Sequence, residues 1–287
     1  MLNKLTDRVY YMDYVSNGDR PVLGLVVGDD YSLVIDGGNS REHANELLKY
    51  TVKLNIPPIK YLLLTHWHWD HVFGITTIGA INIVHEKTDD KLKWMKTLKW
   101  TDKAIHERVL LGEEIEFCEE HMKIEHPDNN RNIEIPVSDI VFDSKVSIDI
   151  GGVIVSAEHI ECDHSEDCVI VNVEGEKVVF IGDAMYNDMY NGNYSYTREK
   201  LYWLIDALID IDADYYIPSH HDMYTHEGFK EFSNYIKEVG DVVGSTISKK
   251  EGIARYENLK ERSATESEVN DIVAFIEGNK KLILDNN

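Results

Sequence analysis

One short segment, His66-Trp-His-Trp-Asp-His71, places three imidazoles and one carboxylate within six residues. It directly follows the apolar run KYLLLT (60–65), which is typical of a fully buried strand. Imidazole and carboxylate are ligands that divalent metals such as Zn²⁺ prefer in proteins. Alternate side chains of an extended segment share one side, so we expect His66 and His68 to bind one ion together. Asp70 and His71 follow after the chain has turned, and we expect them to reach a second ion.

The segments around this motif alternate between strand and helix patterns. Short β-like runs at 8–12, 24–27 and 31–35 lead to Asp36-Gly-Gly38, and Asn39 or Ser40 is suited to cap a helix that ends near Leu54. The buried strand and the metal motif come next. This order predicts an α/β fold in which ligands collect at the ends of strands.

A helical pattern then interrupts the chain over about 86–131. β-like runs return between 140 and 181, and helices are expected after Thr197, after Thr225 and over 266–277. No linker or repeat separates these parts. We therefore expect a single domain over 1–287 that carries a helical insertion.

The composition limits the partners and the location of the protein. The 29 basic and 52 acidic residues give a net charge of −23, which disfavours binding to nucleic acid. No stretch approaches the roughly 18 apolar residues of a membrane span, so no membrane association is expected. Cys118, Cys162 and Cys168 form no CxxC pair, which favours a reducing, cytoplasmic location. The sequence is compatible with an oligomer.

Three later residues occur in the same context as the first motif. His164 lies between two β-like runs, Asp183 follows the apolar strand ending at Gly182, and His220 follows the strand that ends near Ser219. Each carries a metal-binding group at the end of a predicted strand. They are therefore the candidates for completing the coordination of two ions.

With these residues, the chain resembles the hydrolases of the metallo-β-lactamase fold, whose motifs are HxHxDH, GH[ST], GD and PGH in this order. The resemblance covers roughly residues 8–225 and implies a four-layer αβ/βα sandwich. It assigns His66, His68 and His164 to one metal ion. It assigns Asp70, His71 and His220 to a second ion, with Asp183 bridging the two.

The motifs also depart from the family pattern. Asp163 and Ser219 stand where the family has glycine before the third-ligand and last histidines. His221 replaces the small residue that usually follows the last histidine, so His221 is an alternative to His220 as that ligand. Asp183 stands where β-lactamases of classes B1 and B2 carry cysteine, although the turn after His164 is similar to theirs.

The resemblance implies a hydrolase that uses two Zn²⁺ ions, although iron or manganese would suit the same donor atoms. A metal-bridging hydroxide, oriented by Asp70, would attack a small-molecule substrate, namely an ester, lactone, thioester or lactam. The alternatives on the same fold are a mono-iron sulfur dioxygenase and a metal-dependent phosphodiesterase. A non-catalytic metal-binding protein and a flavin-linked di-iron protein fit the ligand set less well.

Four features are expected to decide which substrate binds. Asp183-Ala-Met-Tyr186 resembles the Asp-x-x-Tyr of acyl-homoserine lactonases, in which the tyrosine hydrogen-bonds the substrate carbonyl. Trp69 matches a position that lines the substrate pocket in that branch. His221 is a further candidate for substrate binding, and the insertion over about 86–131 is predicted to form a wall or lid of the cleft.

Overall fold

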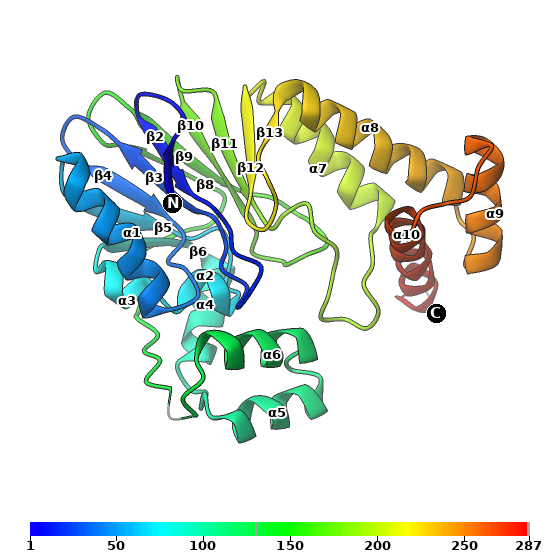
Figure 1. Ribbon diagram of the computed structural model, residues 1–287, viewed down its shortest axis with the longest axis horizontal. Coiled ribbons are helices and arrows are strands. Elements are labelled where there is room, and N and C mark those ends of the chain that lie inside the picture. Colours follow the sequence, from blue (N-terminus) through cyan, green and yellow to red (C-terminus); the bar gives the residue numbers. More distant parts are fainter. Residues whose placement is uncertain (130, 286–287) are drawn as a thin grey trace.

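The computed structural model describes residues 1–129 and 131–285. Two β-sheets stack face to face, and helices cover both outer faces (Figure 1). In strand order, the first sheet consists of β1 (Leu2–Lys4), β2 (Val9–Met12), β3 (Leu23–Val27), β4 (Ser32–Ile35), β5 (Ile59–Leu63), β6 (Ile81–His85) and β7 (Ile140–Phe142). The second consists of β13 (Tyr224–Thr225), β12 (Tyr215–Pro218), β11 (Val178–Gly182), β10 (Val169–Glu174), β9 (Ile154–His159) and β8 (Lys145–Asp149).

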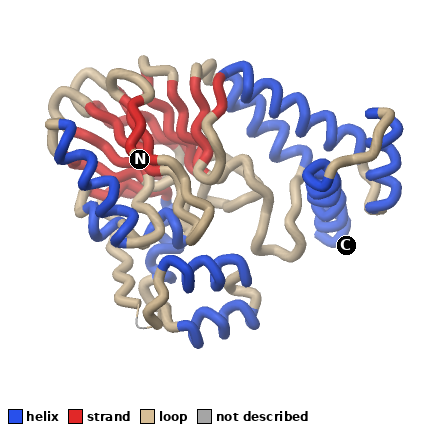
Figure 2. Tube along the Cα trace, viewed as in Figure 1, coloured by secondary structure: helices blue, strands red, loops and turns tan. Residues whose placement is uncertain are grey.

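The helices fall into two groups, which Figure 2 shows on either side of the strands. The group next to the first sheet comprises α1 (Arg41–Leu54), α2 (Trp69–Val72), α3 (Ile75–Ile78), α4 (Glu86–Met95), α5 (Asp102–Leu111) and α6 (Glu116–Glu125). The group next to the second sheet comprises α7 (Arg198–Asp210), α8 (His226–Val243), α9 (Lys249–Lys260) and α10 (Glu266–Asp285). None of the described helices combines the length and the apolar composition that a membrane span requires.

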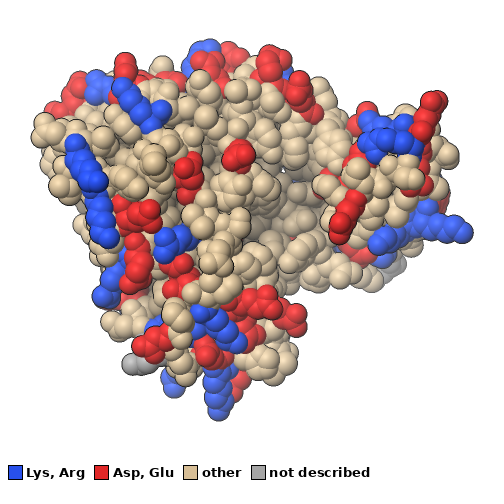
Figure 3. Space-filling view, in the orientation of Figure 1, with Lys and Arg blue, Asp and Glu red and all other residues tan. Residues whose placement is uncertain are grey.

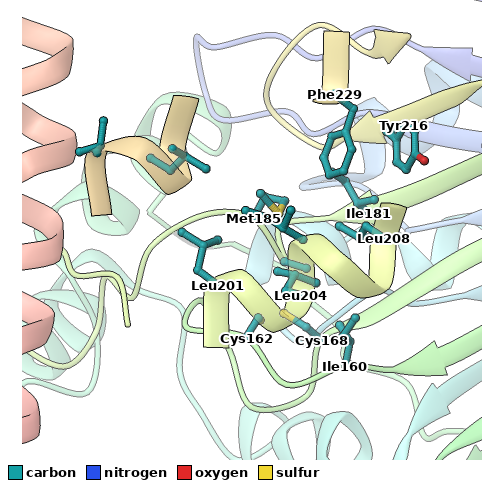
Figure 4. Close-up of a cluster of buried hydrophobic side chains, with 14 of the residues drawn as sticks. Ile160, Cys162, Cys168, Ile181, Met185, Leu201, Leu204, Leu208, Tyr216 and Phe229 are labelled. Carbon is teal, nitrogen blue, oxygen red and sulfur yellow. The ribbon is translucent and has the colours of Figure 1, made fainter. Parts of the chain in front are cut away.

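Buried apolar side chains fill three spaces between these layers. Between the sheets, Leu33 and Leu63 of the first sheet share a cluster with Phe180 of the second. Leu47 of α1 packs on the outer face of the first sheet. Leu204 of α7 belongs to the cluster on the outer face of the second sheet (Figure 4). The expected four-layer αβ/βα sandwich is therefore confirmed.

Parallel strands bring several chain ends to one edge of the sandwich. Strands β4, β5 and β6 pair in parallel in the first sheet, as do β11 and β12 in the second. The two sheets are joined at this edge by backbone hydrogen bonds from Val22 N to Ser219 O and from Val169 N to Thr65 O, both 2.7 Å long. Residues that follow β4, β5, β11 and β12 consequently meet there.

Some helices differ from the sequence predictions. Ser40 does cap α1, with its hydroxyl accepting a hydrogen bond from His43 N. The helical pattern over 86–131 is divided into α4, α5 and α6, and the last helix, predicted over 266–277, continues to Asp285. Helix α9 was not predicted, because only Gly252 and Tyr256 along it are buried and its apolar periodicity is weak.

A contact between Gly24 and Phe180 sets how closely the two sheets approach. A Cβ atom at Gly24 would lie 2.7 Å from Phe180 Cε1 and 3.0 Å from Ile35 Cβ. We expect Gly24→Ala to lower the free energy of unfolding by about 1–3 kcal/mol, because overpacking forces neighbouring side chains to shift. Urea unfolding followed by circular dichroism measures this change.

A double mutant identifies the contact responsible. Phe180→Leu removes the ring that the new methyl group meets. The double variant should therefore lose less free energy of unfolding than the two single variants lose together, by more than about 0.5 kcal/mol. If the losses of the two single variants simply add in the double variant, the Phe180 ring is not the group that excludes a side chain at residue 24.

Candidate metal centre

Asp36 organises the first half of the site. It directly follows β4 and adopts the left-handed region, with φ of 64°, and its Oδ1 accepts a 2.8 Å hydrogen bond from Thr65 N. Its Oδ2 lies 2.9 Å from His71 Nδ1. The single turn of α2 after His68 carries Asp70 and His71 back over the strand end. The carboxylate thus fixes the His71 ring so that Nε2 faces the centre of the site.

The first group of ligand atoms comes from His66, His68, His164 and Asp183, with one atom of each lying within 4.8 Å of all the others. His164 Nε2 lies 3.0 Å from His68 Nδ1 and 3.4 Å from Asp183 Oδ2. His66 Nε2 lies 3.7 Å from the same Asp183 oxygen. His164 Nδ1 donates to Asn187 O at 3.2 Å, which leaves Nε2 free to bind a metal.

The second group comes from Asp70, His71, Asp183 and His220. Asp70 Oδ2 lies 3.0 Å from His71 Nε2 and 3.2 Å from His220 Nε2. Asp183 Oδ2 lies 3.6 Å from His71 Nε2 and 3.5 Å from His220 Nε2. The structure thus brings together all seven predicted ligands in the two sets that the resemblance implies, with Asp183 in both.

These residues fit divalent metal ions. Two ligands of one tetrahedral Zn²⁺ lie about 3.3–3.6 Å apart, since each is about 2.0–2.2 Å from the ion, and the distances above cluster around that value. Four buried ligand atoms have no hydrogen-bond partner: His66 Nε2, Asp70 Oδ2, His71 Nε2 and Asp183 Oδ1. Buried polar atoms without partners are costly, and bound cations would satisfy them.

The surroundings of the histidine ligands shift their pKa values in two opposite directions. Burial lowers the pKa of His66 and His68 well below the usual value, and neighbouring imidazoles lower it further. Burial also lowers the pKa of His71, but the carboxylates of Asp70 and Asp36 outweigh it and hold this pKa well above the usual value. A metal therefore finds some ligands already neutral and must displace a proton from others.

A cavity of about 260 Å³ opens over the ligands. The insertion forms part of its wall through Ile115, Phe117 and Cys118, which lie at and just inside the start of α6. The remaining lining residues are Asp19, His68, Asp70, His164, Asp183, Tyr186, Met189, Tyr190, His220 and His221. The insertion thus contributes to the wall, while its movement as a lid stays a prediction.

Two residues of this site were missed in the sequence. Asp19 adopts φ of 56° and places Oδ1 3.2 Å from His220 Nδ1; burial, and then the Asp70 charge, raise the pKa of Asp19 to about 6. The Tyr190 ring lies 5.0 Å from that of His68, and its hydroxyl donates to Glu114 Oε1 at 2.8 Å. Both residues occur in polar turns without a motif, so no local pattern identifies them.

The candidate substrate-binding residues differ in whether they line the cavity. Tyr186 lines the cavity, and its hydroxyl accepts a 3.1 Å hydrogen bond from His220 N and lies 3.0 Å from His221 Nδ1. His220, not its neighbour, belongs to the ligand set. Trp69 is only 2% exposed, packs against Phe73 and does not line the cavity, because α2 turns this side chain toward the first helical layer. A substrate-binding role for it stays a prediction.

Comparison with known proteins identifies the family and the fold. Residues 18–220 match the family model described as the metallo-beta-lactamase superfamily. A metallo-beta-lactamase family protein from Thermus thermophilus has a TM-score of 0.61 at 16% identity, covering 99% of this chain and 95% of that one. The metallo-beta-lactamase from Pontibacter korlensis has a TM-score of 0.55 at 18% identity, with 82% and 97% covered.

A third solved structure, the metallo-beta-lactamase FIM-1 from Pseudomonas aeruginosa in its mono-zinc form, has a TM-score of 0.54 at 17% identity and covers 83% of this chain and 94% of that one. At these identities the structural likenesses show the fold alone. No curated protein matches the chain significantly.

The role of Asp36 is open to test through metal affinity. We expect Asp36→Asn to weaken metal binding roughly 10–100-fold, because the amide holds the His71 ring less firmly and no longer favours its metal-binding form. Competition with a chromophoric chelator measures the affinity. Asp271→Asn, which changes a carboxylate hydrogen-bonded to Tyr235, is the matched control and should leave the affinity unchanged. Equal affinities in both variants would refute the positioning role.

Proposed function

Because the chain belongs to the metallo-beta-lactamase superfamily, we propose that it is a zinc-dependent hydrolase of a small carbonyl substrate, namely an ester, lactone, thioester or lactam. The observation that carries this proposal is the pair of ligand sets that share Asp183 at the floor of a cavity. Zinc bound there would supply Lewis acidity and lower the pKa of a water molecule to near neutrality.

The chain's own residues have distinct tasks in this proposal. Asp70 would hold and orient the attacking water, since its carboxylate faces both His71 and His220 at the cavity floor. Tyr186 would donate a hydrogen bond from its hydroxyl group to the substrate carbonyl, while its oxygen accepts the His220 N–H. Phe117 of the insertion would contact the apolar part of the substrate. The cytoplasmic location, which was inferred from the cysteines, stays a prediction, and all three cysteines are free thiols in the structure.

Metal analysis combined with substrate panels tests the proposal. We expect about two equivalents of zinc per chain and hydrolysis of at least one lactone, ester, thioester or β-lactam. Asp70→Asn should reduce kcat by roughly 10²-fold or more while the fold persists, because the water loses its orienting carboxylate. Circular dichroism and the exposed-site control Asp241→Asn check the fold.

Other outcomes would contradict this function. One equivalent of iron with oxygen uptake would indicate a dioxygenase, and cleavage confined to phosphodiesters would indicate a phosphodiesterase. Undiminished hydrolysis by Asp70→Asn would also refute the proposal, because the carboxylate would then have no part in the reaction.

The role of Tyr186 predicts a second, smaller effect. We expect Tyr186→Phe to lower kcat/KM about tenfold, since one hydrogen bond to the transition state contributes roughly 1–1.5 kcal/mol. Metal content should not change. Tyr196→Phe is a matched control from the same loop, because the Tyr196 hydroxyl donates to Met185 O. An unchanged kcat/KM in Tyr186→Phe would reduce this tyrosine to a packing role.

A further inference from the structure

Apart from histidines, the charged side chains that line the cavity are all carboxylates among the described residues. Its lining includes the carboxylates of Asp19, Asp70 and Asp183, but no lysine or arginine among the described residues. The side chain of Asp19 is 15% exposed, so this carboxylate adds to the charge of the two ligand carboxylates. An anionic substrate would therefore meet carboxylates along the wall and neither lysine nor arginine among the described residues.

Basic residues close to the lining segments already have partners. Arg20, next to Asp19 in sequence, pairs with Glu125 at 2.8 Å and with Glu46 at 3.2 Å. Lys281 of α10 reaches the loop after β11, but its Nζ lies 2.9 Å from an oxygen of Asp188. On the face seen in Figure 3, the centre shows other and acidic side chains, and basic ones lie toward the edges. These ion pairs hold the neighbouring cations away from a substrate.

The uncharged part of the wall is largely apolar. Ile115, Phe117 and Met189 line the cavity beside the ligands. The Tyr190 hydroxyl donates to Glu114, so it has no proton left for a substrate anion. A charged group placed against Ile115, Phe117 and Met189 would lose its hydration without gaining a partner, which lowers binding much more than a missing apolar contact does.

Bound metal would neutralise the carboxylates without leaving a net positive charge in the cavity. The charge of two divalent ions would be cancelled by the three cavity carboxylates together with the hydroxide that hydrolysis requires. Away from the reacting carbonyl, no excess positive charge would remain to attract an anion. Selection against anionic substrates would thus arise from desolvation at a wall that offers neither lysine nor arginine among the described residues.

We propose that this cavity selects carbonyl substrates whose acyl chain is uncharged, and that it discriminates against substrates carrying a second, anionic group such as a carboxylate, sulfonate or phosphate. This inference rests on the proposed hydrolase function. It narrows the substrate class to neutral esters, lactones or thioesters with an apolar chain.

Two nearly isosteric esters test the inference on the zinc-loaded protein. p-Nitrophenyl 4-(methylsulfonyl)butanoate is neutral, and p-nitrophenyl 4-sulfobutanoate carries a sulfonate in the same place. We expect kcat/KM to be roughly tenfold or more higher for the neutral ester. Equal values, or a preference for the sulfonate, would overturn the proposal.

Substitution of Met189 locates the source of the selectivity. Met189→Lys adds a cation to the wall. It should lower the ratio of kcat/KM for the neutral ester to kcat/KM for the sulfonate ester about tenfold, because the attraction between the new ammonium group and the sulfonate is strong in a partly buried site. Met189→Gln has a similar length without charge and should leave the ratio near that of the wild type. A ratio that does not respond to the lysine would also overturn the proposal.

Binding without turnover separates this inference from the proposed reaction. Calorimetry on the zinc-loaded protein compares 4-(methylsulfonyl)butanamide with 4-sulfobutanamide, and we expect the neutral amide to bind more tightly. If neither these esters nor any compound of the lactone, ester, thioester and β-lactam panels is hydrolysed, the carbonyl-hydrolase proposal fails, but the order of the two amides still tests the charge selectivity. Equal or reversed affinities would refute it.

Discussion

One carboxylate oxygen, Asp183 Oδ2, lies at the centre of the site. It lies 3.4–3.7 Å from ring nitrogens of four histidines: His66, His71, His164 and His220. Its position depends on Gly182, which ends β11 with φ of 53°; a Cβ there would lie 2.8 Å from Thr65 Cβ. The close approach of β11 to the end of β5 is therefore what allows ligands from both sheets to share one carboxylate.

The sequence was sufficient to predict the ligands but not their support. His66 to His71 form a compact motif after an apolar strand, and His164, Asp183 and His220 each follow a strand, so their convergence followed from the α/β pattern. The partners of those ligands were not visible, because Asp19 and His220 are separated by most of the chain and meet only through packing of the two sheets. Trp69 illustrates another limit of sequence patterns: a residue adjacent to ligands in sequence can point in a different direction, since one turn of α2 rotates this side chain into the core.

The loop after β11 connects the site to the C-terminal helix. This loop carries Tyr186 and Tyr190, and Tyr196 N donates to Ala274 O of α10. A Cβ at Gly278 would lie 1.9 Å from Tyr196 O, so the helix and loop backbones are in direct contact. The helix lies beyond the matched family segment, which ends at residue 220, yet it supports a wall of the cavity. Local sequence patterns gave no sign of this connection, because it depends on a long-range backbone contact.

The distribution of the ligands over both sheets has a consequence for how the protein matures. The donors extend from His66 to His220, and neither sheet alone supplies a complete set. During synthesis, a chain that has emerged only through the first sheet would present His66, His68, Asp70 and His71 without the shared carboxylate. Full metal loading would therefore require that the second sheet has docked, which would place ion binding late in assembly.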